Sequence, residues 1–107
     1  MFMKFKVFRT TTFEKEFGKL PKIEQERIDR LEKNLSENPF VGKPLGFTFM
    51  REKRLNGRRI YYLVYEDFVV ILMVAISTKK TQQATIDAVK YKLEEYNDMV
   101  KETLKKL

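Results

Sequence analysis

The sequence predicts an α+β domain whose elements follow the order strand, helix, helix, strand, strand, strand, helix. Three observations support this prediction. An Asn56-Gly57 pair lies between two strand-like runs and favours a two-residue hairpin turn. Apolar residues recur at helical spacing in the first third of the chain and again after residue 81. The run Phe68–Ile76 is apolar throughout, which predicts a central strand buried on both faces.

The first half of the chain predicts one strand followed by a helical hairpin. Residues 2–10 alternate in polarity, which predicts a strand away from the centre of the sheet. Thr11 and Glu14 have the spacing of a capping box, so the first helix is expected to begin there. Pro21 suits the first turn of a second helix, which is expected to end at Asn38.

Three consecutive strands are predicted next. Residues 45–55 and 58–65 flank the Asn56-Gly57 pair, and the expected type I′ turn requires φ > 0 at both central residues. A tight turn at residues 66–67 leads into the apolar run described above. Hairpin turns of this kind join antiparallel strands.

A single long helix is predicted for residues 81–107. Its apolar residues from Ile86 to Val100 repeat at spacings of three and four, forming a seam that packs on the sheet or on a second copy of the chain. At a rise of about 1.5 Å per residue, such a helix is longer than one small sheet can cover. Its distal end is therefore expected to overhang.

Length and composition exclude several classes of protein. A chain of 107 residues with 43% hydrophobic residues predicts one domain, residues 1–107, with one core. The longest apolar run is far too short to span a membrane, and the N-terminus lacks a signal-peptide pattern. The absence of cysteine excludes disulfides and fits a cytoplasmic protein. Histidine is also absent, so we expect no metal or cofactor, and any catalysis must use Lys, Arg, Tyr or carboxylates.

Positive charge is concentrated at the predicted hairpin. The net charge is +7, from 22 basic and 15 acidic residues. The five hairpin cations are Arg51, Lys53, Arg54, Arg58 and Arg59. On a rigid hairpin they would face a common hollow in which a polyanion can dock. Nucleic acid and an acidic protein both fit this expectation.

Several short motifs follow one another along nearly the whole chain. They are Leu20-Pro21-Lys22, Asn38-Pro39, Gly42-Lys43-Pro44-Leu45, Arg59-Ile60-Tyr61-Tyr62, and Val69–Ile76 followed by Thr78-Lys79-Lys80. In this order and spacing they resemble the RelE/ParE superfamily of toxin–antitoxin modules. The resemblance implies a RelE-like fold, in which a small, mostly antiparallel sheet with a basic concave face packs against a helical hairpin and a long C-terminal helix.

The resemblance also implies a function. RelE-like members bind the ribosomal A site and cut messenger RNA there, so the chain would be a toxin and a ribosome-dependent endoribonuclease that inhibits translation. ParE-like members instead inhibit DNA gyrase by protein binding, and a homologue without toxicity would serve as a binding or scaffold protein. The implied partners are the ribosome, mRNA and a cognate antitoxin, with no membrane partner. A homodimer through the C-terminal helix is a further expectation.

Matching by position assigns roles to individual residues. The family's arginine at the start of the third strand falls on Arg59, and the basic residue just past the fourth strand on Lys79 or Lys80. The family's basic residues on the second strand fall on Arg51, Lys53 and Arg54. With Tyr61 added for proton transfer, the residues expected to act in catalysis are Lys53, Arg54, Arg59, Tyr61 and Lys79. Binding of RNA phosphates is assigned to Arg51, Lys53, Arg54, Arg58, Arg59, Lys79 and Lys80.

RNA cleavage through the 2′-hydroxyl needs a base for that hydroxyl, cations for the charge on phosphorus, and an acid for the 5′ oxygen. Guanidinium groups bind phosphate oxygens in pairs. The base would be Lys53, Lys79 or Glu52, and Tyr61 would exchange a proton. Nucleases of the family also place a tyrosine near the C-terminus, where this chain has residues 82–85, Gln-Gln-Ala-Thr, and no tyrosine before Tyr91.

Overall fold

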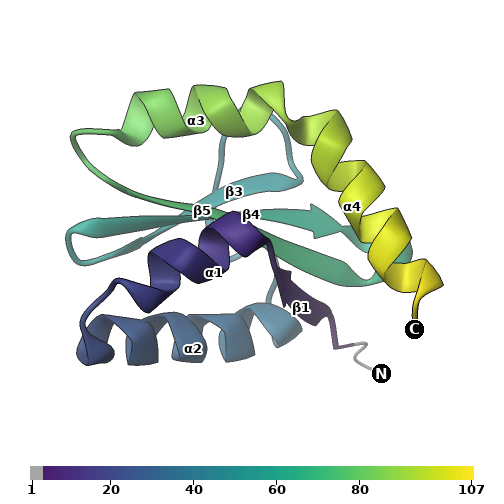
Figure 1. The fold of residues 1–107 in the computed structure, drawn as a ribbon, viewed down its shortest axis with the longest axis horizontal. Helices are drawn as coiled ribbons and strands as arrows, with labels where there is room; N and C mark the ends of the chain where they lie inside the picture. The colour runs from purple at the N-terminus through teal and green to yellow at the C-terminus, as the bar shows by residue number, and fades with distance from the viewer. Residues whose placement is uncertain (1–3) are drawn as a thin grey trace.

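The computed structural model describes residues 4–107. Within this range, one five-stranded sheet has the strand order β1-β5-β4-β3-β2 (Figure 1). The strands are β1 (Lys6–Arg9), β2 (Lys43–Pro44), β3 (Met50–Leu55), β4 (Arg58–Tyr65) and β5 (Val70–Thr78). The α-helices are α1 (Thr11–Gly18), α2 (Lys22–Glu37), α3 (Gln82–Tyr91) and α4 (Leu93–Lys105). Only β1 and β5 pair in parallel, which confirms the predicted α+β class and the mostly antiparallel sheet.

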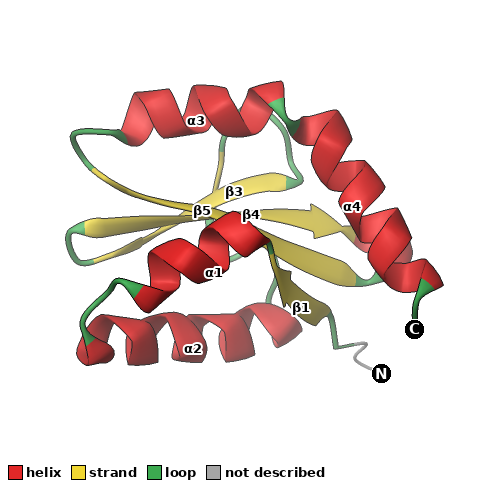
Figure 2. Cartoon of the chain, in the orientation of Figure 1, coloured by secondary structure: helices red, strands yellow, loops and turns green. Residues whose placement is uncertain are grey.

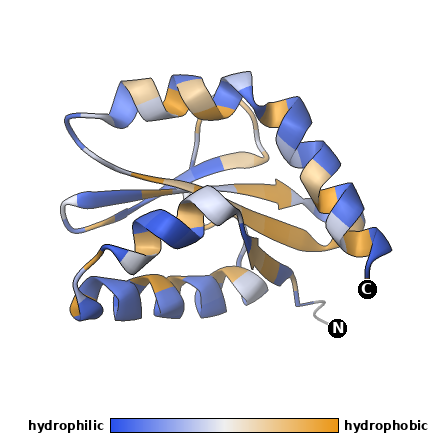
Figure 3. Ribbon diagram, viewed as in Figure 1, coloured by the Kyte–Doolittle hydropathy of each residue, from blue (hydrophilic) through white to orange (hydrophobic). Residues whose placement is uncertain are grey.

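Helices cover both faces of the sheet (Figure 2). Helices α1 and α2 pack on one face, where Phe13 and Leu35 meet Ile60 and Tyr62 of β4. Helices α3 and α4 pack on the other face, where their apolar residues meet Tyr61 of β4 and its neighbours. The central strands are therefore apolar on both faces, and the outward turns of the helices are hydrophilic (Figure 3). This confirms that the apolar run forms a strand inside the sheet, but the strand begins later than predicted: β5 starts at Val70, and Phe68 is exposed in a 3-10 helix, Glu66–Phe68.

The first strand lies at an edge of the sheet, as predicted. It is shorter than the expected residues 2–10, of which 1–3 lie outside the described residues. The first helix begins one residue earlier than the capping box suggested, because Thr10 is its N-cap. Thr10 has extended backbone and its hydroxyl accepts a hydrogen bond from the Phe13 N–H at 3.0 Å, whereas Thr11 is already helical.

The hairpin between β3 and β4 is confirmed, with Leu55 opposite Arg58 across a two-residue loop. Asn56 has the positive φ, 56°, that such a loop needs. Among the glycines only Gly46 has a positive φ, 88°, so the predicted type I′ geometry at Gly57 is wrong. Gly46 also explains why β3 is shorter than predicted, since it turns the chain between β2 and β3.

The long C-terminal helix is broken into two. Lys92 has φ −101° and ψ 10°, which ends α3 and changes the direction of the chain before α4 (Figure 1). Because of this bend, Ile86 of α3 and Val100 of α4 both reach the same core. The seam thus packs on the sheet, the first of the two predicted alternatives, and the prediction of one straight overhanging helix is wrong. None of the helices in the described part of the chain is long and apolar enough to cross a membrane.

Candidate nucleic-acid interface

The five hairpin cations lie on two faces of the sheet. Side chains alternate along a strand, and in the hairpin register Arg54 is opposite Arg59 while Lys53 is opposite Ile60. Ile60 belongs to the core under α1 and α2, and Tyr61 to the core under α3 and α4. The expectation of one common hollow is therefore wrong, because the sheet separates the cations. The α3–α4 face carries Arg54 and Arg59, and the other face carries Arg51, Lys53 and Arg58.

Arg59 is the buried cation of the α3–α4 face and lies one residue pair from the hairpin loop. It is opposite Arg54 on β3 and Ser77 on β5, so the three residues form a row across three strands. Only 4% of Arg59 is exposed. It makes no ion pair with any carboxylate of residues 4–107, and its Nε is buried without a hydrogen-bond partner. A buried guanidinium without a counter-ion is costly, and an incoming anion would offset that cost.

An adjacent row on the same face holds groups suited to acid–base chemistry. Glu52 of β3 is opposite Tyr61 of β4, and both are buried. Gln82, the first residue of α3, donates a hydrogen bond from Nε2 to Glu52 Oε2 at 2.8 Å. The hydroxyl oxygens of Tyr61 and Ser77 lie 2.8 Å apart. Six residues of this face are called the cleavage row, after the reaction proposed for them below: Glu52, Arg54, Arg59, Tyr61, Ser77 and Gln82.

The protonation of Tyr61 limits its possible role. Burial raises the pKa of Tyr61 to about 12; the hydrogen bond with Ser77 lowers it, and the Glu52 carboxylate raises it, by smaller amounts. Tyr61 therefore keeps its proton at neutral pH and is suited to donate it. The group in this row that can accept a proton is the Glu52 carboxylate.

Lys79 and Lys80 lie just past the last strand, where the sequence placed them. Both are exposed in the turn between β5 and α3, and Thr81 precedes the first helical residue. Tyr91 does not replace the tyrosine expected near the C-terminus, because it is 91% exposed at the end of α3. In this part of the sequence, Gln82 instead contacts the row, through its hydrogen bond to Glu52.

The cations on the opposite face have different surroundings. Arg58 is held by Glu24 of α2, with 2.9 Å between Nε and the carboxylate oxygen. Arg51 is buried with its guanidinium carbon 5.0 Å from the centre of the Phe40 ring. Lys53 is half-buried and makes no ion pair within residues 4–107. Of the three, only Arg58 has its charge compensated.

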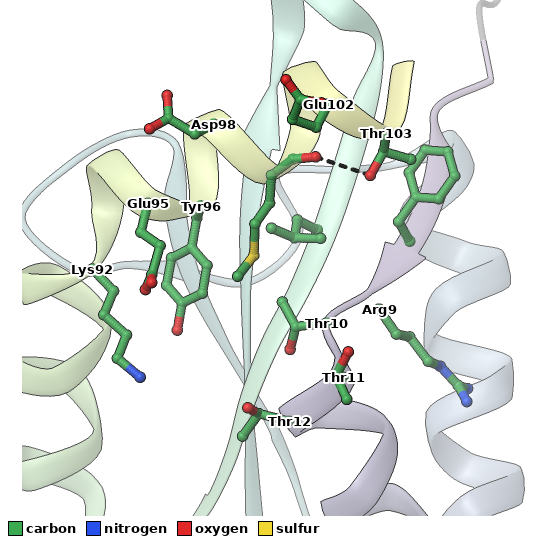
Figure 4. A pocket seen from close by; sticks show the side chains of 13 residues that line it. Arg9, Thr10, Thr11, Thr12, Lys92, Glu95, Tyr96, Asp98, Glu102 and Thr103 are labelled. Carbon is green, nitrogen blue, oxygen red and sulfur yellow. Dashed lines mark hydrogen bonds between the residues drawn. The ribbon is translucent and has the colours of Figure 1, made fainter. Parts of the chain in front are cut away.

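Two wide hollows of the described surface lie away from the hairpin. Figure 4 shows one of about 620 Å³ between the start of α1 and α4. Its α4 wall carries Glu95, Asp98 and Glu102, which would repel phosphate. The other, of about 720 Å³, lies between the β4–β5 turn and α4. Residues 4–107 contain no cluster of acidic side chains placed to hold a metal ion.

Comparison with known proteins identifies the fold. No protein-family model matches the chain, and no curated protein sequence matches it. Solved structures of RelE toxins do. A mutant of the Escherichia coli toxin RelE in the free state has a TM-score of 0.72 and 20% identity, covering 83% of this chain and 98% of that chain. The archaeal RelE–RelB complex from Pyrococcus horikoshii OT3 gives a TM-score of 0.66 and 22% identity, covering 72% and 97%.

A third similar structure is the toxin–antitoxin complex RelBE2 from Mycobacterium tuberculosis, with a TM-score of 0.64 and 22% identity, covering 71% of this chain and 99% of that chain. The chain therefore has the fold of the RelE toxins, which confirms the fold expected from the sequence motifs. Each of these relatives is matched almost completely, whereas part of this chain extends beyond every match.

Sequence reasoning missed Ser77, and it left open whether Gln82 and Gln83 are exposed helix residues or bind a ligand. No motif marks Ser77, because its importance depends on the register that places it opposite Arg59. Glu52 was one of three candidate bases, and its place beside Tyr61 distinguishes it from Lys53 on the opposite face. A count of strand alternation outward from the hairpin loop is the signal that separates Glu52 from Lys53, whereas Ser77 lies on β5, outside the hairpin.

Proposed function

We propose that the protein is the toxin of a toxin–antitoxin pair and that it cuts messenger RNA on the ribosome, in the cytoplasm. The observation that best supports this proposal is the unpaired, buried Arg59 next to Glu52 and Tyr61, on one face of a RelE-like fold. An unpartnered guanidinium beside a carboxylate and a protonated hydroxyl supplies the three groups that RNA cleavage needs.

In the proposed reaction, Glu52 accepts the proton of the ribose 2′-hydroxyl. The 2′ oxygen forms a bond to phosphorus while the bond from phosphorus to the 5′ oxygen breaks, and Tyr61 donates its proton to that leaving oxygen. Arg59 and Arg54 stabilise the negative charge that builds up on the phosphate oxygens. The products are a 2′,3′-cyclic phosphate and a 5′-hydroxyl. Lys79 and Lys80 would contact flanking phosphates.

Access to the cleavage row requires movement of α3. Glu52, Arg59 and Tyr61 are buried in the free chain, and Gln82 of α3 is bonded to Glu52. Arg54 is exposed and marks the open end of the row. We infer that the start of α3 moves aside when RNA enters and that ribosome binding favours this opening, since the isolated chain holds it closed.

The proposed partner of the toxin is a cognate antitoxin. Similar structures from Escherichia coli, Mycobacterium tuberculosis and Pyrococcus horikoshii are described as toxin–antitoxin or RelE–RelB complexes. The net charge of +7 favours an acidic antitoxin segment. A homodimer through the C-terminal helix stays a prediction, and it must use a surface other than the seam that packs on the sheet.

The test is cleavage of mRNA in programmed ribosomes, mapped by primer extension. The wild-type protein should yield cuts in the A-site codon, Arg59→Gln should yield none, and Lys101→Gln should cut as the wild type does, because Lys101 is an exposed cation on α4. A supercoiling assay with gyrase runs in parallel. Inhibition of gyrase without RNA cleavage would replace this proposal with the ParE-like alternative, and absence of both effects would favour a non-toxic binding protein.

A further inference from the structure

A second basic surface lies on the opposite face of the sheet, between α2 and β3. It is an open hollow of about 270 Å³. Three cations line it: Arg27 and Arg30 of α2 and Lys53 of β3. Its remaining lining consists of Leu31, Asn34 and Leu55, so no carboxylate lines the hollow.

The cations of this hollow are not neutralised, and Arg27 among them is held in place. Arg27, Arg30 and Lys53 form no ion pair within the described chain, unlike neighbouring Arg58 with its Glu24 partner. With its amide oxygen turned toward the guanidinium, Asn56 accepts a hydrogen bond from Arg27 Nη1 at 2.6 Å. This contact links α2 to the hairpin loop. The Arg27 guanidinium is therefore fixed between α2 and the hairpin loop.

Spacing along α2 places its polar groups on one side of the helix. Arg27, Arg30 and Asn34 follow one another at intervals of three and four residues, and residues so spaced are neighbours on a helix surface. Two guanidinium forks and one amide thus face the same open space as Lys53. Guanidinium forks match pairs of phosphate oxygens, and an amide or ammonium group can add single contacts.

Arg51 extends the surface along β3. It lies two residues before Lys53 and therefore on the same face of the strand. It is 9% exposed, its Nε is buried without a hydrogen-bond partner, and it rests against the Phe40 ring. An unpaired, nearly buried guanidinium is a second, independent indication of an anionic ligand.

We propose that this α2–β3 surface binds the phosphate backbone of RNA, as a docking site separate from the cleavage row. In its hollow the apolar lining is limited to Leu31, which is buried, and the half-buried Leu55; the Phe40 ring lies outside the hollow, against the Arg51 guanidinium. Bases would need an aromatic platform for stacking, and an amphipathic acidic peptide would need an apolar groove. Backbone contact requires only the fixed cations that are present. This inference goes beyond the proposed function and does not depend on cleavage chemistry.

The test measures binding of a fluorescein-labelled single-stranded RNA to the full chain, without ribosomes, over a series of salt concentrations. In the variant Arg27→Gln/Arg30→Gln we expect at least a tenfold loss of affinity at low salt. We also expect the slope of log affinity against log salt to fall by about 1.4, since each phosphate contact to a single strand contributes about 0.7. Arg27→Lys/Arg30→Lys should keep most of the slope, which separates lost charge from lost structure.

The matched control removes two exposed cations from α4, in the variant Lys101→Gln/Lys105→Gln. Equal losses in the α2 and α4 variants would overturn the proposal, because the effect would then be one of net charge. A loss confined to binding of a poly-glutamate peptide, with RNA binding intact, would also overturn it in favour of an acidic protein. The cleavage proposal is tested independently of this one. Arg59→Gln should abolish cleavage on ribosomes but leave the salt dependence of RNA binding unchanged.

Discussion

Arg9 and Arg59 are largely covered arginines on neighbouring parts of one sheet, yet their surroundings differ completely. The Arg9 guanidinium lies 2.7 Å from Glu32 and 2.9 Å from Asp29, and its central carbon is 3.9 Å from the centre of the Phe17 ring. The hydrogen bond with Glu32 is the main reason that the pKa of Arg9 is raised. Arg59 has no ion pair and an unpartnered Nε.

This difference separates a structural cation from one available for binding. Carboxylates of α1 and α2 surround Arg9 and tie β1 to both helices, so the charge of Arg9 is already compensated within the fold. Near Arg59 the one buried carboxylate is Glu52, and Gln82 already donates to it. The surroundings of an arginine, more than its exposure, thus indicate whether it serves folding or recognition.

The largest expected effect is on cleavage by Arg59→Gln. Loss of a cation that stabilises the transition state should lower the single-turnover rate on programmed ribosomes by about 10²–10³-fold. The free energy of unfolding, measured in urea, should stay the same or rise, because an uncompensated buried charge is removed. A fall of several kcal/mol would show that Arg59 is structural, as Arg9 is.

Arg9→Met should have the opposite profile. It leaves Glu32, Asp29 and Glu14 without their shared cation, and we expect the free energy of unfolding to fall by about 2–3 kcal/mol. Cleavage by the fraction that remains folded should be unchanged. Lys4→Met is the matched control, because its ion pair with Glu37 is exposed and 3.8 Å long and should be worth less than about 0.5 kcal/mol. Equal effects of the two variants would contradict the comparison.

Alkaline pH should destabilise the fold through Tyr61. The folded state holds its pKa at about 12, above the ordinary value of 10.0. The protonated hydroxyl of Tyr61 therefore contributes its full share to the free energy of unfolding below pH 10. That share is lost as the pH rises toward 12, because the unfolded chain releases the proton first. At pH 11 the loss is about 1.4 kcal/mol. Urea unfolding at pH 8 and pH 11 should show less pH dependence in Tyr61→Phe than in the wild type.

Tyr65 provides an internal check on that measurement. Its pKa is also raised to about 12 by burial, so Tyr65→Phe should reduce the alkaline loss by a similar amount. Tyr61→Phe should in addition slow cleavage, whereas Tyr65→Phe should not, because Tyr65 lies outside the cleavage row. An unchanged cleavage rate in Tyr61→Phe would remove Tyr61 from the proposed reaction.

The smallest expected effect is the loss of stability when the hydrogen bond from Gln82 to Glu52 is removed. Gln82→Met removes a hydrogen bond to a buried carboxylate and should lower the free energy of unfolding by about 1–2 kcal/mol. Gln83→Met, at the next position on α3, removes only an exposed hydrogen bond to Asp87. This variant should change the free energy of unfolding by less than about 0.5 kcal/mol. If the two variants unfold alike, Gln82 does not hold Glu52, and the closed position of α3 has another cause.

Most of the fold could be predicted from the sequence because its signals are local. The Asn56-Gly57 pair, the apolar periodicity of the helices and the apolar run of β5 each act within a few residues. The break at Lys92 gave no such signal. The apolar spacing continues through it without glycine or proline, and the change of direction results from packing of Tyr96 and Val100 on the sheet.

The candidate site was predicted less completely, because its geometry depends on register. The sequence identified Arg54, Arg59 and Tyr61, which the fold brings to one face. It also grouped Lys53 with them, although strand alternation places Lys53 on the opposite face. The hydrogen bond from Gln82 to Glu52 joins residues 30 positions apart and follows only from how α3 docks.

The parallel pair of β1 and β5 has a consequence for the newly made chain. Lys6 of β1 lies opposite Val70 of β5, so β1 has no strand partner until the polypeptide has been synthesised as far as β5. Ser77, which completes the row through Arg59, emerges later still. A nascent polypeptide without β5 therefore lacks both the finished sheet and the complete row around Arg59. Because β1 and β5 are far apart in the sequence, their pairing is one of the late steps by which this sheet can form.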